Sequence, residues 1–237
     1  MPAKRNHAAF DHRSRVGVVR RAHTRQCLIE SAMLVFAEHG AEASVIDELI
    51  TLAGVSRGTF YNYFRSNEEL LQAVAEEVGN QMLLAVDPVV REHEDPAARV
   101  ATGVRLVLGV ARAYPRLAAF MVRVGPPAIA AQGLVTEYLP RDLRDGMARG
   151  RFSPMHPRLA FDLVTGPVLA GFYSLLTAEV PPNFPDAMAT AILLALGVPR
   201  TRAKRLGTLP LPRLDFGAES LFVRAEARAL RHVDKLS

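Results

Sequence analysis

The sequence of 237 residues predicts an all-α protein in which a small three-helix domain precedes a larger helical domain. Apolar residues recur at spacings of three and four along most of the chain, which is the period of an amphipathic helix. No segment shows sustained alternation of apolar and polar residues bounded by hairpin turns, as paired strands would. Serine or proline opens most of the helix-sized segments, at the positions where a helix N-cap or first turn favours these residues.

The chain begins with a polar segment that differs from the rest. Residues 1–20 are basic and show no hydrophobic period, so we expect a disordered arm. Apolar residues then recur at helical spacing over 21–39, and Gly40 stands where a glycine commonly ends a helix. The first ordered element is therefore expected to be an amphipathic helix.

Three serines open three further helices within about 25 residues. Ser44 and Ser66 each begin a capping-box pattern, in which the serine oxygen accepts a hydrogen bond from the first turn of the helix. Ser56 is the expected N-cap of a short helix between them, and Gly54 separates that helix from the preceding one. This succession predicts a helix-turn-helix domain over 21–66.

The remainder of the chain divides into three parts. A longer helix over 67–86 connects the small domain to a larger one over 87–200, with the boundary at Asp87-Pro88 because proline ends or begins helices. Residues 201–237 form a basic extension with a final helix at 217–235. The larger domain has five helix-sized apolar segments, at 96–113, 115–124, 127–149, 157–178 and 185–197.

Charge is unevenly distributed along the chain. Residues 1–25 carry seven Lys or Arg against one acid (+6), and residues 199–237 carry nine against four (+5). Residues 26–198 carry thirteen bases against nineteen acids (−6). Basic ends suit a polyanion such as DNA, or an anionic membrane surface. The abundance of Arg among the bases serves phosphate binding or reflects a GC-rich genome, and both interpretations remain open.

Cysteine content and the N-terminal sequence indicate the cellular compartment. Cys27 is the single cysteine, which excludes an intramolecular disulfide and a cysteine-rich zinc site. Residues 1–25 contain no apolar stretch long enough for a signal peptide. We therefore expect a cytoplasmic protein.

One apolar segment leaves a second hypothesis open. Residues 159–178 form a run in which Asp162 is the only charged residue, and the run is long enough to cross a membrane. Asp162, Pro167 and the lack of flanking Trp or Tyr belts argue against a span. A helix that is apolar on all sides also suits a buried subunit interface. The alternative is therefore a membrane-associated helical protein anchored by this segment.

Catalytic motifs are missing from the sequence. It contains no Gly-x-Ser-x-Gly, no Gly-rich phosphate loop and no His-Glu-x-x-His, so we expect a protein that is not an enzyme and that uses no cofactor. Glu92-His93-Glu94-Asp95 has side chains that can ligate a metal, but a solvated acidic turn is the favoured interpretation, and we expect no metal site.

The helix-turn-helix pattern predicts DNA binding. The major groove admits one helix, and small or polar side chains on a helix that begins at Ser56 can reach base edges. The tyrosine hydroxyls can donate to phosphates, and a serine at a helix N-terminus marks a phosphate site. The alternative is a helical hairpin in a larger bundle, with the tyrosines in a core. The candidate DNA-binding residues are Ser44, Ser56, Arg57, Gly58, Thr59, Tyr61, Asn62 and Tyr63.

A family resemblance supports the DNA-binding hypothesis. Residues 25–71 resemble the DNA-binding domain of the TetR/AcrR family of bacterial transcriptional regulators. The stretches that carry the resemblance occur in the family's order without gaps, and they are Leu28-Ile29-Glu30-Ser31-Ala32, Phe36-Ala37-Glu38-His39-Gly40, Ala53-Gly54-Val55-Ser56-Arg57-Gly58-Thr59-Phe60-Tyr61, Tyr63-Phe64 and Glu68-Glu69-Leu70.

The resemblance implies a homodimer in which each subunit offers one recognition helix, near 56–62, to DNA. It implies contacts to the DNA backbone at Tyr61 and Tyr63 and a phosphate contact at Ser44. A basic N-terminal segment such as 4–25 is expected to add backbone or minor-groove contacts.

Three positions depart from the family's pattern. Asn67 stands where the family usually has a phosphate-holding Lys, so we expect a DNA contact there that is uncharged and less dependent on salt. Ile50 stands where the family favours Ala, and the larger side chain requires repacking between two helices. Leu34 replaces a commonly charged residue, which predicts contact with an extra element such as the arm.

The resemblance also implies a ligand site in the larger domain. TetR-like proteins bind a small inducer between helices, and the few charged residues in these segments favour an apolar or aromatic ligand. For any one candidate a place in the core is the favoured interpretation, whereas some members of the set are expected to line a cavity. The candidates are Met82, Leu106, Val110, Tyr114, Phe120, Met121, Tyr138, Phe161, Phe172 and Tyr173.

Two segments correspond to the helices that pair across the dimer in this family, 157–178 and 185–197. The extension over 201–237 is expected to be a solvated tail, with contacts to the partner subunit or to DNA as alternatives. The sequence predicts a dimeric regulator, acting as a repressor released from a palindromic operator by an unknown small-molecule inducer. Small residues would let the paired helices approach closely, and they are Ala170, Gly171, Ala187, Ala189, Ala191 and Ala195.

Overall fold

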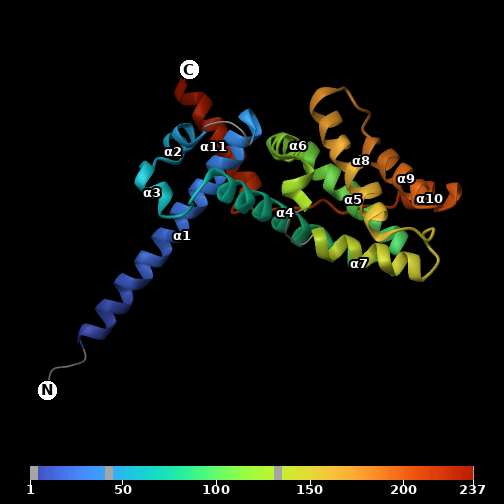
Figure 1. Cartoon of the computed structure of the whole chain (residues 1–237), viewed down its shortest axis with the longest axis horizontal. Helices are drawn as coiled ribbons and strands as arrows, with labels where there is room; N and C mark the ends of the chain where they lie inside the picture. The colour runs from blue at the N-terminus through green and yellow to red at the C-terminus, as the bar shows by residue number, and fades with distance from the viewer. Residues whose placement is uncertain (1–4, 41–44, 131–134, 237) are drawn as a thin grey trace.

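The computed structural model describes residues 5–40, 45–130 and 135–236, and every regular element in these ranges is a helix. Figure 1 shows a small group of helices and a larger bundle, joined by one long helix. The predicted all-α class with two helical domains is therefore confirmed. The helices are α1 (Arg5–His39), α2 (Ile46–Ala53), α3 (Arg57–Tyr61), α4 (Asn67–Arg91), α5 (Pro96–Ala113), α6 (Pro115–Ala130), α7 (Val135–Ala148), α8 (Pro157–Thr177), α9 (Phe184–Ala195), α10 (Arg200–Leu206) and α11 (Leu221–Leu236).

The first helix is much longer than the sequence indicated. α1 has 35 residues and begins at Arg5, so the prediction of a disordered arm over 1–20 is wrong from that residue onward. Its N-terminal half projects away from the small domain (Figure 1). Residues 5–16 contain neither Gly nor Pro, and adding residues to an existing helix avoids the cost of a new nucleus. The amphipathic helix expected over 21–39 therefore continues toward the N-terminus.

The start of α2 also differs from the prediction. α2 begins at Ile46 with Val45 at its N-cap, and the Val45 side chain makes no capping hydrogen bond. Ser44 itself lies outside the described residues. Val45 is 3% exposed, which indicates that burial of this apolar side chain sets the start of the helix.

The two other serine caps are confirmed. Ser56 Oγ accepts from the Thr59 backbone N–H at 3.1 Å, which fixes the start of α3. Ser66 Oγ accepts from the Glu69 backbone N–H at 3.2 Å, and the Glu69 carboxylate accepts from the backbone N–H of Arg65 at 2.7 Å. These bonds satisfy donors that a helix N-terminus leaves without intrahelical partners.

α4 passes through the predicted domain boundary. It continues to Arg91 with Pro88 inside it, so an end at residue 86 is wrong. Pro88 removes one hydrogen bond, to the carbonyl of Leu84, but Leu84 is 60% exposed and water can replace the lost donor. Val86 and Val90, on the buried face, keep the helix packed on both sides of the proline.

Three further boundaries were not predicted. α6 extends to Ala130 across a kink at Gly125, whose φ of +75° favours glycine, and α7 begins at Val135. A single helix over 127–149 is therefore wrong, and residues 131–134 lie outside the described ranges. α10 was not predicted, because its seven residues are mostly basic. Only Ala203 and Leu206 are buried, and two apolar residues do not make a recognisable helical period.

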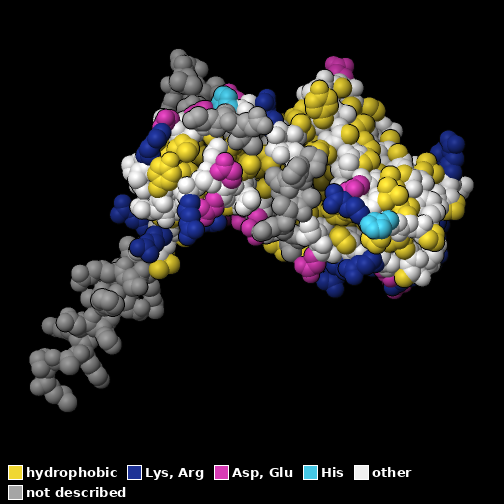
Figure 2. Space-filling view, viewed as in Figure 1, with side chains coloured by type: hydrophobic (Ala, Val, Ile, Leu, Met, Phe, Trp, Pro, Cys, Tyr) yellow, Lys and Arg dark blue, Asp and Glu magenta, His cyan; other side chains and the backbone are white. Residues whose placement is uncertain are grey.

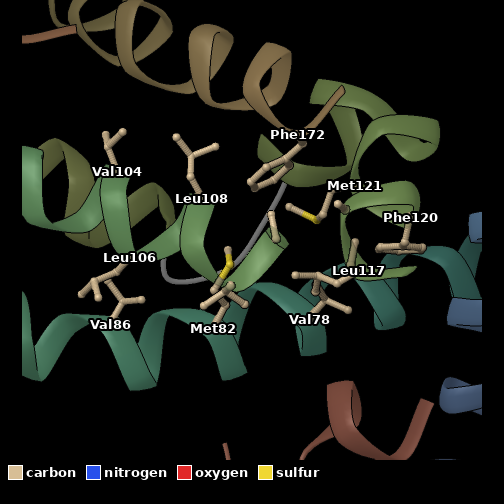
Figure 3. Close-up of a cluster of buried hydrophobic side chains, with 14 of the residues drawn as sticks. Val78, Met82, Val86, Val104, Leu106, Leu108, Leu117, Phe120, Met121 and Phe172 are labelled. Carbon is tan, nitrogen blue, oxygen red and sulfur yellow. The ribbon is translucent and has the colours of Figure 1, made fainter. Parts of the chain in front are cut away.

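The core of the larger domain lies between α4, α5, α6 and α8. Figure 3 shows Met82 of α4, Met121 of α6 and Phe172 of α8 directed toward one another. The fully buried Leu108 and Phe120 belong to the same continuous core, which also extends into the small domain. The two domains therefore share one apolar interior.

The C-terminal helix returns to the small domain and packs against α1, as Figure 1 shows. Leu221, Phe222 and Ala225 are at most 1% exposed. The backbone N–H of Leu221 donates to the Gln81 side chain of α4 at 2.8 Å. The expected solvated tail is therefore wrong for α11, since this amphipathic helix buries its apolar face within its own subunit.

A buried carboxylate holds α11 in place. Glu30 of α1 is 5% exposed, and its two oxygens lie 2.9 Å from Nε of Arg224 and 3.3 Å from Nη2 of Arg228. Nη1 of Arg228 also donates to the backbone carbonyl of Leu52, at 3.0 Å, and to Oγ of Ser31, at 3.2 Å. We call Glu30, Arg224 and Arg228 the clasp.

The opposite side of α11 contacts the larger domain. Glu226 forms an ion pair with Arg116 of α6. Phe222 packs against Tyr114 and Phe216, with ring centroids 5.7 and 4.9 Å away. α11 therefore lies between the two domains and makes ion pairs with both.

We expect Arg228→Ala to lower the free energy of unfolding by about 2 kcal/mol, because it leaves a buried carboxylate with one partner fewer. The corresponding fall in melting temperature is roughly 4–8 °C for a chain of this size, measured by calorimetry at fixed protein concentration. Arg213→Ala, at an exposed position before α11, is the matched control and should leave the transition unchanged. Equal melting temperatures for the two variants would show that the clasp contributes nothing to stability.

Candidate DNA-binding surface and ligand cavity

The recognition helix presents most of its predicted side chains to solvent. Along α3 and its caps, Ser56, Arg57, Gly58, Tyr61 and Asn62 are exposed. The buried alternative for the tyrosines is contradicted at Tyr61, which is 49% exposed. The remaining candidates are half-buried, and they are Thr59, Tyr63 and Asn67.

Phe60 anchors this short helix to the domain. Its side chain is fully buried, with its ring centroid 5.2 Å from Tyr61 and 6.2 Å from Phe64. Because α3 has only five residues, burial of Phe60 and the cap from Ser56 supply stability that helix propensity cannot. Because Phe60 fixes the buried face of α3, it also determines which residues of α3 remain exposed to solvent.

One candidate side chain is held by the neighbouring helix. Nη2 of Arg57 donates to Oδ1 of Asp47, in the first turn of α2, at 2.6 Å. This hydrogen bond raises the pKa of Arg57, so the guanidinium stays charged. The pair joins the two helices of the helix-turn-helix on its exposed side.

Basic side chains gather around α3. Figure 2 shows Lys and Arg side chains at the end of the molecule that carries the small domain. Exposed acidic residues also lie on this domain, including Asp47, Glu48, Glu68 and Glu69, so its surface carries both charges. Arginines are the groups that pair with phosphates, which supply most of the non-specific energy of DNA binding. The exposed arginines of this domain are Arg20, Arg21, Arg25, Arg57 and Arg65.

The departures from the family's pattern are accommodated by packing. Leu34 and Ile50 are both half-buried and lie against the hydrophobic core. Ile50 therefore fits between the helices of the small domain, as the expected repacking requires. Asn67 is the first residue of α4, directly after the Ser66 cap.

A cavity of about 140 Å³ lies between α4, α5, α7 and α8, with one side formed by α6. Four of the ten predicted ligand residues line it: Met82, Met121, Tyr138 and Phe172. Figure 3 shows Met82, Met121 and Phe172 at the apolar side of this space. The cavity therefore includes part of the predicted ligand-binding set, whose role in binding stays a prediction.

The other six predicted ligand residues do not line the cavity. Leu106, Val110 and Phe120 are core residues with at most 5% exposure. Tyr114 packs against α11, and burial raises the pKa of its hydroxyl. Phe161 is half-buried beneath the Arg158 guanidinium, and Tyr173 is 57% exposed.

The cavity has a charged end that the prediction missed. Asp87, Arg99 and Asp142 are among its lining residues. Arg141 lies behind them, with Nη2 2.8 Å from Asp87 Oδ1 and Nε 3.0 Å from Asp142 Oδ1. Its pKa is raised by the hydrogen bond to Asp142. Nε of Arg99 lies 3.1 Å from the same Asp142 oxygen, so Asp142 is shared between two guanidinium groups.

A signal for the charged end was present in the sequence. Met82, Leu83, Val86 and Val90 recur at helical spacing along α4, and Asp87 falls on the same face. A carboxylate on an apolar helix face is rarely left without a partner, which makes it a candidate for a functional site.

The apolar helix α8 has an exposed face. It meets the length and hydropathy of a membrane span, with a mean hydropathy of 1.5, and 22% of that window is buried. Many yellow side chains lie on this part of the surface in Figure 2. The exposed apolar and small residues recur at helical spacing on α8 and on the adjacent α9, with the exposed Asp162 near the N-terminal end of the same α8 face; they are Leu159, Gly166, Ala170, Tyr173, Leu176, Ala187, Ala191, Leu194 and Ala195.

The capped helix-turn-helix with an attached helical bundle is the architecture of a class of DNA-binding regulators. Residues 28–74 match the family model described as bacterial regulatory proteins, tetR family. Residues 95–208 match that of the tetracyclin repressor-like C-terminal domain. The crystal structure of RolR in complex with resorcinol has a TM-score of 0.68 and 31% identity, and the match covers 84% of this chain and 100% of RolR. The chain belongs to the TetR family of transcriptional regulators.

Curated relatives match over only part of the chain. The transposon Tn10 TetC protein of Escherichia coli is 35% identical over 72 residues, which is 30% of this chain and 34% of TetC. The regulator RutR of E. coli K12 is 30% identical over 92 residues, 39% of this chain and 43% of RutR. The chain thus spans less than half the length of these two relatives. Its own function is that of a DNA-binding transcriptional regulator.

We expect Tyr61→Phe to weaken binding to all duplexes evenly, because it removes an exposed hydroxyl for which the family resemblance implies a contact to the DNA backbone. The loss is about 1 kcal/mol, or roughly fivefold in Kd per contact. Fluorescence anisotropy with several labelled duplexes measures it. Thr208→Val, which removes an exposed hydroxyl shortly after α10, is the control and should bind as the parent does. A loss confined to one duplex would assign Tyr61 to base recognition instead.

Proposed function

We propose that this regulator is a dimeric repressor that leaves a palindromic operator when a small hydroxylated aromatic compound fills the cavity. The proposal rests on the apolar cavity with a charged end, which is lined by α4, the helix that directly follows the recognition helix α3. α4 begins after the Ser66 cap and lines the cavity from Met82 to Val90.

The size and lining of the cavity favour one aromatic ring. An apolar cavity of roughly 150 Å³ holds one benzene molecule, and this cavity measures about 140 Å³. Its valine, methionine and phenylalanine walls suit the faces of such a ring. Asp87 and Asp142 supply carboxylate oxygens that accept from hydroxyl groups. A phosphorylated ligand would place like charges next to these two acids.

The similarity to RolR supports the same class of ligand. RolR was crystallised with resorcinol, a benzene ring with two hydroxyl groups, and the match extends over all of its length. At 31% identity the relationship includes the ligand domain as well as the DNA-binding domain. We therefore extend the ligand class, rather than resorcinol itself, to this chain.

Release of the operator follows from a difference in affinity. Two recognition helices bind successive major grooves when they lie about 34–36 Å apart, one turn of DNA. A ligand that binds better to a form with another spacing lowers operator affinity by that difference. A small shift of α4 at the cavity would be carried to α3, because only residues 62–66 separate the two helices.

A homodimer through α8 and α9 accounts for the exposed apolar face. Small residues line it at helical spacing, including Ala170 and Ala191, and these let helices approach closely. The rival interpretation is a membrane anchor over 159–178. Dimerisation is favoured because α8 and the adjacent α9 form one apolar face together. A membrane span would require apolar exposed residues on α8 only.

The experiment that tests the proposal selects bound duplexes from a random library at two salt concentrations, using the full-length protein. We expect a palindrome whose binding weakens with salt. Recovery of no preferred sequence would contradict an operator-specific repressor. Addition of resorcinol or related phenols to the selected complex then tests release, and unchanged binding with every compound of the series would contradict the ligand class.

We expect Asp87→Asn to weaken resorcinol binding about tenfold, because a hydroxyl loses a charged acceptor. Titration calorimetry measures the change. Glu76→Gln makes the same change on an exposed position of α4 and should bind resorcinol as the parent does. Equal affinities for the parent and Asp87→Asn would place the ligand's hydroxyl groups elsewhere.

We expect Leu194→Arg to produce monomers at micromolar concentration, because it places a charge in each half of the proposed interface. Sedimentation velocity distinguishes the two states. Leu84→Arg, at an exposed leucine of α4, is the control and should leave the dimer intact. A dimer that tolerates Leu194→Arg would exclude this face as the interface.

A further inference from the structure

The ion pair between Arg57 and Asp47 lies on the surface that carries the recognition helix. Arg57 is the first residue of α3, and Asp47 is the second residue of α2. Their side chains are 57% and 76% exposed, and the two atoms lie 2.6 Å apart. Both side chains are therefore accessible to DNA, and DNA bound at this surface would contact the two as a pair.

Without a restraint, the arginine at this position would bind several groups of the DNA equally well. Its guanidinium can pair with any phosphate, or it can read the O6 and N7 acceptors of guanine when its flat fork has the correct orientation. Asp47 engages Nη2, one of the three nitrogens, and the guanidinium has five N–H donors. The remaining donors stay available, while the rotation of the group is restricted.

The carboxylate also changes the electrostatic balance of the surface. It offsets the charge of Arg57 and repels phosphates, so it weakens sequence-independent binding. An exposed ion pair contributes little in water, but its interaction strengthens when DNA displaces the water around it. Asp47 therefore disfavours a phosphate contact more than a contact with a neutral base edge.

We propose that Asp47 is a positioning residue that directs Arg57 toward a guanine in the major groove. The chemistry recognised is the pair of acceptors on one guanine in each half-site. This inference rests on the proposed operator-specific function and adds to it the residue that determines specificity at one base position.

The adjacent residue provides a matched control. Glu48 lies in the same first turn of α2, carries the same charge and is exposed. It pairs with His39 of α1, with Oε2 3.1 Å from Nε2, and not with Arg57. Glu48→Gln and Asp47→Asn thus remove equal charge from the same helix N-terminus, and only the second change releases Arg57.

The experiment repeats the duplex selection with the full-length parent, Asp47→Asn, Glu48→Gln and Asp47→Glu. For Asp47→Asn we expect tighter binding to unrelated duplexes and a preference for guanine, at one position of each half-site, that falls about tenfold. Glu48→Gln should keep that preference, and Asp47→Glu should restore most of it. Circular dichroism confirms that each variant is folded.

Arg57→Ala and the double variant with Asp47→Asn separate positioning from direct contact. If Asp47 acts through Arg57, the double variant loses no more preference than Arg57→Ala alone. A further loss in the double variant would show that Asp47 itself contacts a base, and would overturn the inference. An unchanged guanine preference in Asp47→Asn would also overturn it, while the operator-specific function would stand. A parent that selects no sequence would overturn both.

Discussion

The carboxylate of Glu30 imposes the strongest constraint on the architecture. A buried charge is costly unless it is paired, and this one lies on α1 inside the small domain. Both of its arginine partners come from the last helix, about 200 residues later in the chain. The chain after α10 must therefore return across the larger domain before the small domain is complete. α11 then buries its apolar face and leaves Glu226 directed to α6. The recognition unit consequently depends on both ends of the sequence.

Local chemistry made several elements predictable. α5 begins and ends at the residues expected from its period, because Pro96 fixes the first turn and the adjacent Asp95 caps it. Ser56 and Ser66 fix the starts of α3 and α4 in the same way. Failures occurred where tertiary packing outweighs the local signal. Pro88 reads as a boundary, yet packed valines on both sides carry α4 through it.

The functional sites were predictable to different degrees for the same reason. The recognition helix is a local unit of seven residues, so capping and a family pattern define it. The cavity combines side chains from helices spread over 90 residues, and an apolar residue in sequence does not reveal whether it faces a cavity or the core. Phe120 and Phe172 look alike in the sequence, but only Phe172 lines the cavity. The charged end depends on Asp87 and Asp142, which only tertiary structure brings together.

These features limit how a ligand can influence DNA binding. The small domain is attached to the larger one through α4, through the contacts of α1 with α6, and through α11. A simple hinge at the start of α4 would break the contacts of α1 with α6 and the contacts made by α11, including the buried clasp. A movement that preserves these contacts must move α6 and α11 together with the small domain, while α4 shifts relative to the cavity. α6 contributes Met121 to the cavity and Arg116 to the ion pair with α11, so it contacts both the proposed ligand site and the clasp-bearing helix. Under the proposed function, repacking along α6 together with a shift of α4 preserves these contacts, whereas bending of α4 alone does not.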